Sequence, residues 1–192
     1  MVRAKKYWLL DSRQLYCSKV LIMKISIPVE NGFLPDKYGK YAPASEQKYG
    51  HAICSFPITI EEVPEGTQSL ALMFIDYDST PVCGFTWIHW LMCGISPDTK
   101  LIPENASQNP QPEWRQGFNS LFHDLEAVDN DLTVAQAYEG PCPPDMDHTY
   151  TLRVFALDTD LDLSEGYFIN QLHWAMQGHI LEVAEVNVLS RS

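Results

Sequence analysis

The sequence is poor in basic residues and in long apolar runs. Its 13 lysines and arginines face 25 aspartates and glutamates, which leaves a formal net charge of −12. Nucleic acids and anionic membrane surfaces are bound through clustered lysine and arginine, so neither is expected as a partner. The chain also lacks an apolar run of about 18 residues, and we therefore expect no membrane insertion.

Cysteines are few, and their spacing shows no pairing. The five cysteines are an odd number and include no Cys-x-x-Cys pair. Small secreted domains use even sets of cysteines in disulfide frameworks, so we expect reduced thiols and a cytoplasmic location. The sequence also lacks the Gly-x-Ser-x-Gly, Walker and His-Glu-x-x-His motifs of large enzyme classes. It therefore predicts a non-enzyme with no catalytic residue, cofactor or metal.

Residues 1–22 are expected to be an extension that precedes a single domain at 23–192. The first apolar run is interrupted by Asp11 and Arg13, which spoils the core of a signal peptide. Met23 is the start of a strand-like segment, and we treat it as the hypothetical true translation start. The remaining length is sufficient for one domain with a large core.

Strand patterns dominate the middle of the chain, because short apolar or alternating runs there are bounded by turn residues. Pro28 cannot donate to a central ladder, so the first strand is expected at a sheet edge. Tyr150, Leu152, Val154 and Ala156 share one face of the last strand. The expected strands are 25–29, 56–63, 69–75, 85–93 and 149–158.

Helix patterns gather at the C-terminus. Ser164 is expected to cap a helix that carries Phe168, Leu172 and Met176 at helical spacing. After Gly178, residues 179–188 are expected to form a second helix. The predicted fold class is mainly β: an antiparallel β-sandwich with peripheral and C-terminal helices.

Polar residues interrupt the apolar strands where burial is costly. Asp76 and Asp78 follow the 69–75 strand, and His89 lies inside the next one. Buried carboxylates and imidazoles are costly to desolvate unless they pair, so this cluster is a candidate site. The simpler alternative is that His89 is a core histidine bonded to one of these aspartates for stability alone.

A second group of candidates follows a loop rich in glycine and proline. Gly140 and Pro141 open this loop, Cys142 lies within it, and His148 and Tyr150 follow at the start of a strand. A rigid loop can offer backbone amides to an anion, and histidine and tyrosine add donors. Two aspartates and two histidines could instead hold a divalent metal, which is the weaker interpretation.

Taken together, these motifs resemble the phosphatidylethanolamine-binding protein family, in its bacterial and archaeal Raf kinase inhibitor-like branch. The family's Asp-Pro-Asp-x-Pro motif, followed by a strand with Trp and His, resembles residues 76–81 and 87–90. Its Gly-Pro-x-Pro-Pro and His-Arg-Tyr motifs resemble 140–144 and 148–150, and its closing Ala-Met-x-Gly-His-Ile-Leu resembles 175–181. An opening Gly-x-x-Pro-x-x-Tyr resembles 32–38, so the likeness spans about residues 23–187.

The resemblance implies a Greek-key β-sandwich with a small pocket at one end that accepts phosphate, phosphorylethanolamine or a carboxylate. It also implies a regulator of a kinase or of another partner enzyme, and it leaves a homodimer open. The ligand-binding residues implied here are Asp76, Asp78, His89, Gly140, Pro141, His148 and Tyr150.

Three positions depart from the family pattern. Tyr77 replaces the proline of Asp-Pro-Asp, and we expect its ring to reshape or narrow the mouth of the pocket. Thr149 replaces the arginine of His-Arg-Tyr, which removes a charge near the rim. Ser190 stands where bacterial relatives often have tyrosine.

Three functions are therefore weighed. The leading one is a binding module for a small anionic ligand. The second is a hydrolase that acts on a phosphate or acyl ester through His89 and His148, with Ser79 or Cys142 as the nearby nucleophile candidates. The third is a protease inhibitor, which requires an exposed reactive segment such as the acidic stretch at 103–131.

Overall fold

The computed structural model describes residues 22–192, so the expected extension falls outside the described residues except for Ile22. The prediction of a mainly β fold is confirmed, because strands outnumber helices among the described residues. The predicted antiparallel arrangement is confirmed as well, because every pairing between the named strands is antiparallel. The strands are β1 (Lys24–Ser26), β2 (Gln47–Lys48), β3 (His51–Ala52), β4 (Ile58–Glu61), β5 (Ser69–Asp76), β6 (Trp87–Ile95), β7 (Leu101–Ile102), β8 (Arg115–Gln116), β9 (His148–Leu157) and β10 (Ile180–Ser190). The helices are α1 (Thr80–Cys83), α2 (Leu132–Ala135) and α3 (Ile169–Met176), with 3₁₀ helices at Asp36–Tyr38, Ala44–Glu46 and Ser120–Val128.

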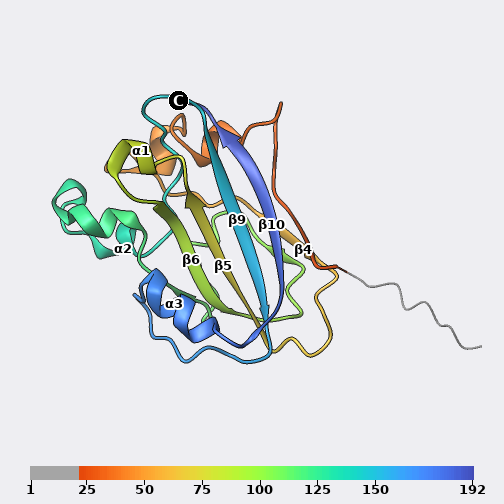
Figure 1. Cartoon of the computed structure of the whole chain (residues 1–192). Coiled ribbons are helices and arrows are strands. Elements are labelled where there is room, and N and C mark those ends of the chain that lie inside the picture. The colour runs from red at the N-terminus through yellow and green to blue at the C-terminus, as the bar shows by residue number, and fades with distance from the viewer. Residues whose placement is uncertain (1–21) are drawn as a thin grey trace, which may run out of the picture.

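A five-stranded sheet forms the centre of the molecule, with the order β10-β9-β5-β6-β8 (Figure 1). Its central strand β5 places Leu72 opposite Val154 on β9 and Met92 on β6. A second sheet has the order β1-β4-β7, and β1 lies at its edge as expected. The Greek-key connection between strands stays a prediction.

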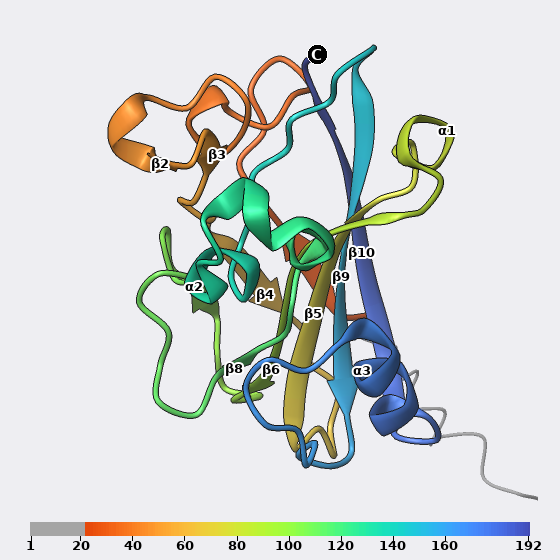
Figure 2. The same ribbon diagram turned by 90° about the vertical axis from the view of Figure 1, so that its left-hand side faces the viewer.

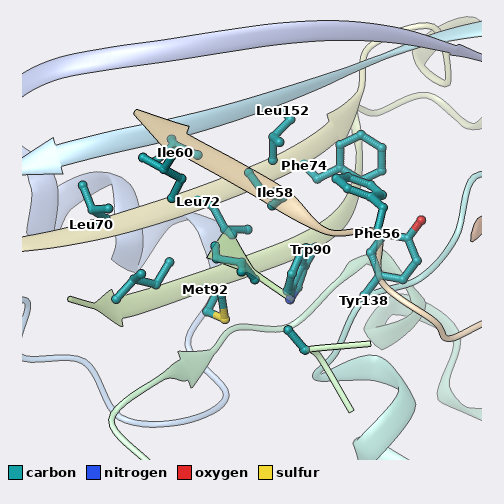
Figure 3. Packing of buried hydrophobic residues seen from close by; sticks show 14 of the residues in the cluster. Phe56, Ile58, Ile60, Leu70, Leu72, Phe74, Trp90, Met92, Tyr138 and Leu152 are labelled. Atoms are coloured by element: carbon teal, nitrogen blue, oxygen red, sulfur yellow. The ribbon is translucent and has the colours of Figure 1, made fainter. Parts of the chain in front are cut away.

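The main core lies between these two sheets. Alternation along β4 buries Ile58 and Ile60, while Thr59 and Glu61 point to solvent. The predicted inner face of β9 is confirmed, since Tyr150, Leu152, Val154 and Ala156 all belong to this core. Aromatic rings fill its wider end, where Phe56 packs edge-on against Phe74 at 5.1 Å between ring centroids (Figure 3). Burial of this apolar surface is the principal source of the fold's stability.

Helix α3 covers part of the opposite face of the large sheet. Figure 2 shows β4 and α3 on opposite sides of β5 and β9. Leu172 and Met176 face Phe155 and Leu157 in a second apolar cluster. The helix begins later than expected: Phe168, not Ser164, is its N-cap, and the Gln171 side chain accepts the Phe168 backbone N–H at 2.8 Å. A side-chain hydroxyl is therefore not what caps this helix.

The expected second C-terminal helix is wrong, because this segment is the strand β10. Gly178 has φ of +84°, which ends α3 and turns the chain back toward the sheet. Ala184 and Val188 are then buried and Val186 is half-buried, with a period of two, against β9. Ile180, Val183 and Ala184 also fit helical spacing, so the short apolar pattern was ambiguous until a strand partner was known.

The acidic stretch at 103–131 is folded. It contributes β8 to the edge of the large sheet and the 3₁₀ helix at 120–128. Leu121 and Val128 are buried against Val134 and Ala135 of α2 in a small separate cluster. Residues 108–113 of the stretch are exposed and lie in no strand or helix, so the protease-inhibitor alternative stays a prediction.

Among residues 22–192, no helix is long and apolar enough to cross a membrane.

Candidate functional site: a cavity where three core strands end

Three strands of the large sheet bring polar side chains to one end. Asp76 is the last residue of β5, His148 is the first of β9, and β5 pairs Asp76 with Tyr150 across the strands. Helix α1 and strand β3 lie at the same end (Figure 2). These elements enclose a cavity of about 230 Å³. Its lining comprises His51, Asp76, Ser79, Val82, Cys83, Trp87, His89, Glu139, Cys142, Pro143, Pro144, His148 and Tyr150.

His148 is held on both sides by carboxylates. Its Nδ1 lies 2.8 Å from Oδ2 of Asp76, and its Nε2 lies 2.9 Å from Oδ1 of Asp145. A carboxylate only accepts, so both ring nitrogens donate. Burial lowers the pKa of this imidazole, but the two aspartates outweigh it and the pKa is raised. The arrangement therefore stabilises an imidazolium at the cavity wall.

His89 is held differently and has the opposite charge preference. Its Nδ1 donates to the backbone carbonyl of Glu139 at 2.9 Å, and no hydrogen bond to its Nε2 is present among residues 22–192. The alternative in which His89 bonds to Asp76 or Asp78 is thus wrong. Burial lowers the pKa of His89, despite the nearby charge of Glu139. This histidine is therefore neutral, and its Nε2 is open to the cavity.

Tyr150 completes the inner wall. Its ring lies 5.1 Å from that of His89 and 6.3 Å from that of His148, between centroids. Burial, followed by the charge of Asp76, raises the pKa of the Tyr150 hydroxyl far above its usual range. The hydroxyl therefore remains protonated and can donate a hydrogen bond.

The structure does not place the other predicted residues in the lining. Asp78 accepts the Thr149 backbone N–H at 2.8 Å and so ties the end of β5 to β9. Gly140 donates its N–H to the Ala52 carbonyl at 2.8 Å, and proline at 141 has no N–H, so neither amide is left for an anion. A Cβ at Gly140 would lie 2.4 Å from the Tyr38 carbonyl oxygen, so close packing explains the glycine. These residues shape the loop behind the cavity.

Three polar groups of the cavity were assigned no role from the sequence: the His51 imidazole, the Trp87 indole N–H and the Glu139 carboxylate. Glu139 is only 3% exposed, and its carboxylate accepts from Trp87 Nε1 at 2.7 Å and from His51 Nδ1 at 3.0 Å. A glutamate between apolar residues and Gly-Pro was a usable signal for Glu139. No sequence spacing indicated His51, which lies on the two-residue strand β3 and is distant in the sequence from the other lining residues.

The expected effect of Tyr77 on the mouth is wrong. The side chain is not part of the cavity lining and is 45% exposed. Arg153 donates to its hydroxyl at 3.1 Å, which holds the ring on the outer face of the sheet. Replacement of proline at this position therefore leaves the cavity open.

No group of three histidine, cysteine, aspartate or glutamate side chains in residues 22–192 is arranged to hold a metal ion. The cysteines at the rim, Cys83 and Cys142, are both exposed free thiols.

Comparison with known proteins gives the same picture along most of the chain. Residues 25–191 match the family described as phosphatidylethanolamine-binding protein. Protein YxkA of Bacillus subtilis (strain 168) is 45% identical over 161 residues, which cover 84% of this chain and 95% of YxkA. A UPF0098 protein of Chlamydia pneumoniae is 34% identical over 151 residues, covering 78% of this chain and 89% of that protein.

Two crystal structures share the fold. CT736 of Chlamydia trachomatis, a putative phosphatidylethanolamine-binding protein homologue, superposes with a TM-score of 0.69 at 28% identity and covers 90% of this chain and 99% of its own. Escherichia coli YbcL, described as a member of the mammalian family, gives a TM-score of 0.70 at 20% identity, covering 88% and 98%. At 20% identity, the comparison with YbcL shows a shared fold and no more. From the matched residues and these relatives, the chain belongs to the phosphatidylethanolamine-binding protein family.

Proposed function

We propose that this protein binds a small ligand through a phosphate or carboxylate group in the cavity at the end of β5, β6 and β9. The observation that carries the proposal is the open Nε2 of His89, a residue that is only 4% exposed and lines the cavity, with no hydrogen bond to Nε2 among the described residues. A ring nitrogen that reaches a cavity and has no protein partner is free to bind a ligand there. The Tyr150 hydroxyl and the His148 charge support an anion there.

Binding of an anion at His89 is coupled to a proton. The neutral ring keeps its hydrogen on Nδ1, because the Glu139 carbonyl can only accept. Its Nε2 must therefore gain a proton before it can donate to a phosphate or carboxylate oxygen. A bound anion stabilises that imidazolium and raises the pKa of His89. Uptake of the ligand should thus be accompanied by uptake of a proton near neutral pH.

The contacts of the nucleophile candidates favour a binding protein over a hydrolase. The Ser79 hydroxyl lies 2.7 Å from the Asp76 carbonyl and 2.9 Å from the Phe85 carbonyl, and it accepts the Trp87 backbone N–H at 2.8 Å. The Ser79 hydroxyl thus stabilises the turn around α1. Among residues 22–192, no imidazole is hydrogen-bonded to it that could act as a base. Desolvation raises the pKa of Cys142, which keeps that thiol protonated and weakly nucleophilic.

Regulation of a partner enzyme, such as a kinase, is the second part of this proposal and extends it by analogy with the family. Its support is Val82, an exposed apolar side chain of the cavity lining, together with exposed Phe85 and Met146, each two residues along the chain from a lining residue (Cys83 and Pro144). Exposed apolar side chains near a ligand site suit a surface that a partner protein binds according to whether the site holds a ligand. A cytoplasmic setting remains part of the proposal and follows from the free thiols.

Calorimetric titration with phosphate and with acetate tests the binding. We expect saturable heats, and proton uptake revealed by repeating the titration in buffers of different ionisation enthalpy. His89→Asn keeps an N–H for the Glu139 carbonyl but lacks Nε2, so it should lose both signals. His173→Asn, on the exposed side of α3, is the matched control. Absence of heat at millimolar ligand, or unchanged binding by His89→Asn, would contradict the proposal.

A further inference from the structure

One residue holds two of the cavity's imidazoles. The backbone carbonyl of Glu139 accepts Nδ1–H of His89 at 2.9 Å, and Oε1 of its carboxylate lies 3.0 Å from Nδ1 of His51. Both histidines line the same cavity. Since each is held by Nδ1, each has its Nε2 free of protein partners within residues 22–192.

His148 differs from this pair in its hydrogen bonding. Both of its ring nitrogens already donate, to Asp76 and to Asp145. It can therefore supply positive charge to the cavity but has no N–H left for a ligand unless Asp145 is displaced. Of the three histidines in the lining, His51 and His89 are the ones that can form a new hydrogen bond.

The position of His51 is fixed by a braced carboxylate. Trp87 Nε1 donates to Oε2 of Glu139 at 2.7 Å, and the Glu139 backbone N–H donates to the His89 carbonyl at 2.9 Å. Glu139 is thus held by a hydrogen bond of its backbone and by one of its carboxylate. The carboxylate orients the His51 ring, as a carboxylate orients the imidazole of a catalytic dyad. The His51 side chain remains 26% exposed, so a ligand can reach it.

The charges around His51 favour its protonated form. The hydrogen bond to Glu139 raises the pKa of this imidazole, against the opposing effect of burial. Lys48 is its partner residue across β2 and β3, but the Lys48 ammonium is ion-paired with Asp131. The other titratable side chains of the lining are Asp76, Cys83, His89, Cys142, His148 and Tyr150.

We infer that His51 is a second anion-binding residue of this cavity, so that a phosphate or carboxylate group is held between Nε2 of His51 and Nε2 of His89, with Glu139 positioning both rings. The inference rests on the proposed function and assigns the contacts of the same ligand. It gives His148 an indirect role, through its charge. Hydrogen bonds between an imidazolium and an anionic oxygen are among the stronger ones in proteins, which makes each contact measurable by substitution.

His51→Asn tests the contact directly. The asparagine amide can still donate to Glu139, so the network behind the cavity is preserved while Nε2 is removed. We expect phosphate affinity to fall on the order of tenfold, the loss typical of one charged hydrogen bond. His173→Asn should bind phosphate as the unaltered protein does. In the unaltered protein, phosphate should also raise the pKa of His51, as followed by NMR of its ring protons.

Glu139→Gln separates positioning by charge from a purely structural role. Glutamine preserves the shape and an acceptor for Trp87 but removes the charge that favours the His51 imidazolium. Phosphate binding should weaken near neutral pH and recover as the solution is acidified, because acid protonates His51 without its partner. Because proton uptake at His89 strengthens binding in acid for every variant, each affinity is compared with that of the unaltered protein at the same pH, and this ratio should show no recovery for His51→Asn. A loss of binding that is equal at every pH would contradict this role for Glu139.

The outcomes separate the inference from the proposed function. If phosphate binds and His89→Asn abolishes binding, but His51→Asn binds with unchanged affinity, the role of His51 is overturned and the proposed function stands. If the unaltered protein does not bind phosphate or acetate, both are overturned. Circular dichroism and the urea midpoint of each variant show whether a loss of binding reflects unfolding.

Discussion

The middle of the large sheet and its cavity end are built by the same strands, yet they are stabilised in different ways. Along β5, Leu72 and Phe74 lie on the inner face, and the next inward residue is Asp76. Along β9, the inward order is His148, Tyr150 and Leu152. The cavity is therefore the continuation of the core, with polar side chains at positions that the same alternation directs inward.

The difference lies in what each buried side chain requires. In the middle of the sheet, burial of apolar surface is favourable without any specific partner. At the cavity end, each carboxylate or imidazole must be paired, as Asp76 is with His148 and Glu139 is with His51 and Trp87. His89 Nε2 breaks this pattern, and the proposal that the cavity end binds a ligand rests on this difference.

Leu72→Ala should give the largest loss of stability. Leu72 is fully buried between the sheets, and its truncation leaves a cavity that costs about 2–5 kcal/mol of unfolding free energy. Leu101→Ala, at a side chain that is 54% exposed on β7, should cost no more than about 0.5 kcal/mol. Urea denaturation of both variants measures the contrast. Similar losses for the two would contradict the assignment of the core.

Asp76→Asn should have a smaller effect on stability but a specific effect on charge. Removing one partner of a buried polar pair costs about 1–3 kcal/mol. It also removes the principal attraction that raises the pKa of His148, so that pKa should fall. NMR titration of the His148 ring protons gives the value. An unchanged pKa would mean that the pair with Asp76 does not form.

The pH dependence of stability should have a maximum, because two histidines act in opposite directions. The pKa of His148 is raised in the folded state, so its contribution is complete below the unfolded value of 6.5 and is lost as the pH rises through the folded pKa. The pKa of His89 is lowered, so its contribution is present above 6.5 and is lost as the pH falls toward the folded pKa.

Urea midpoints measured across this range test both limbs. Asp76→Asn should flatten the decline on the alkaline side, and His89→Asn should flatten the decline on the acidic side. The phosphate-free protein is used, because a bound anion raises the pKa of His89 and hides the acidic limb. If both variants kept the full curve, other groups would have to account for it.

Asp145→Asn should have the smallest effect. Its side chain is 54% exposed, so solvent screens its attraction to His148. The pKa of His148 should fall less than it does in Asp76→Asn, since the more exposed partner is more strongly screened. Asp147→Asn, in the same loop but bonded to the Ser192 backbone N–H, is the matched control. A larger shift than in Asp76→Asn would reverse the ranking of the two aspartates.

The sequence was sufficient for the parts of the molecule that depend on alternation and on local motifs. β5, β6 and β9 were predicted from their apolar runs, and Asp76, His89, His148 and Tyr150 do line one cavity. These four residues lie close together because β5 pairs with both β6 and β9 in the large sheet. β10 was not predicted, because its apolar residues satisfy both the helical and the strand period, and only pairing with β9 decides between them.

The second half of the cavity depends on contacts between distant segments. His51 reaches Glu139 across 88 positions of the chain, and Trp87 reaches it across 52. No local pattern encodes such a meeting, since loops are placed by what they pack against. Gly140 shows a related limit. The motif around it was recognised from the sequence, but the sequence did not show that its N–H donates to the Ala52 carbonyl and is therefore not available to an anion.

The central claim is that the cavity end binds an anion while the rest of the sheet does not, and NMR of the histidine side chains during titration with phosphate tests it most directly. We predict saturable shifts at His89 and His51, a smaller one at His148, and none at the exposed His173 and His179. Absence of any shift at millimolar phosphate, or equal shifts at all histidines, would contradict the account.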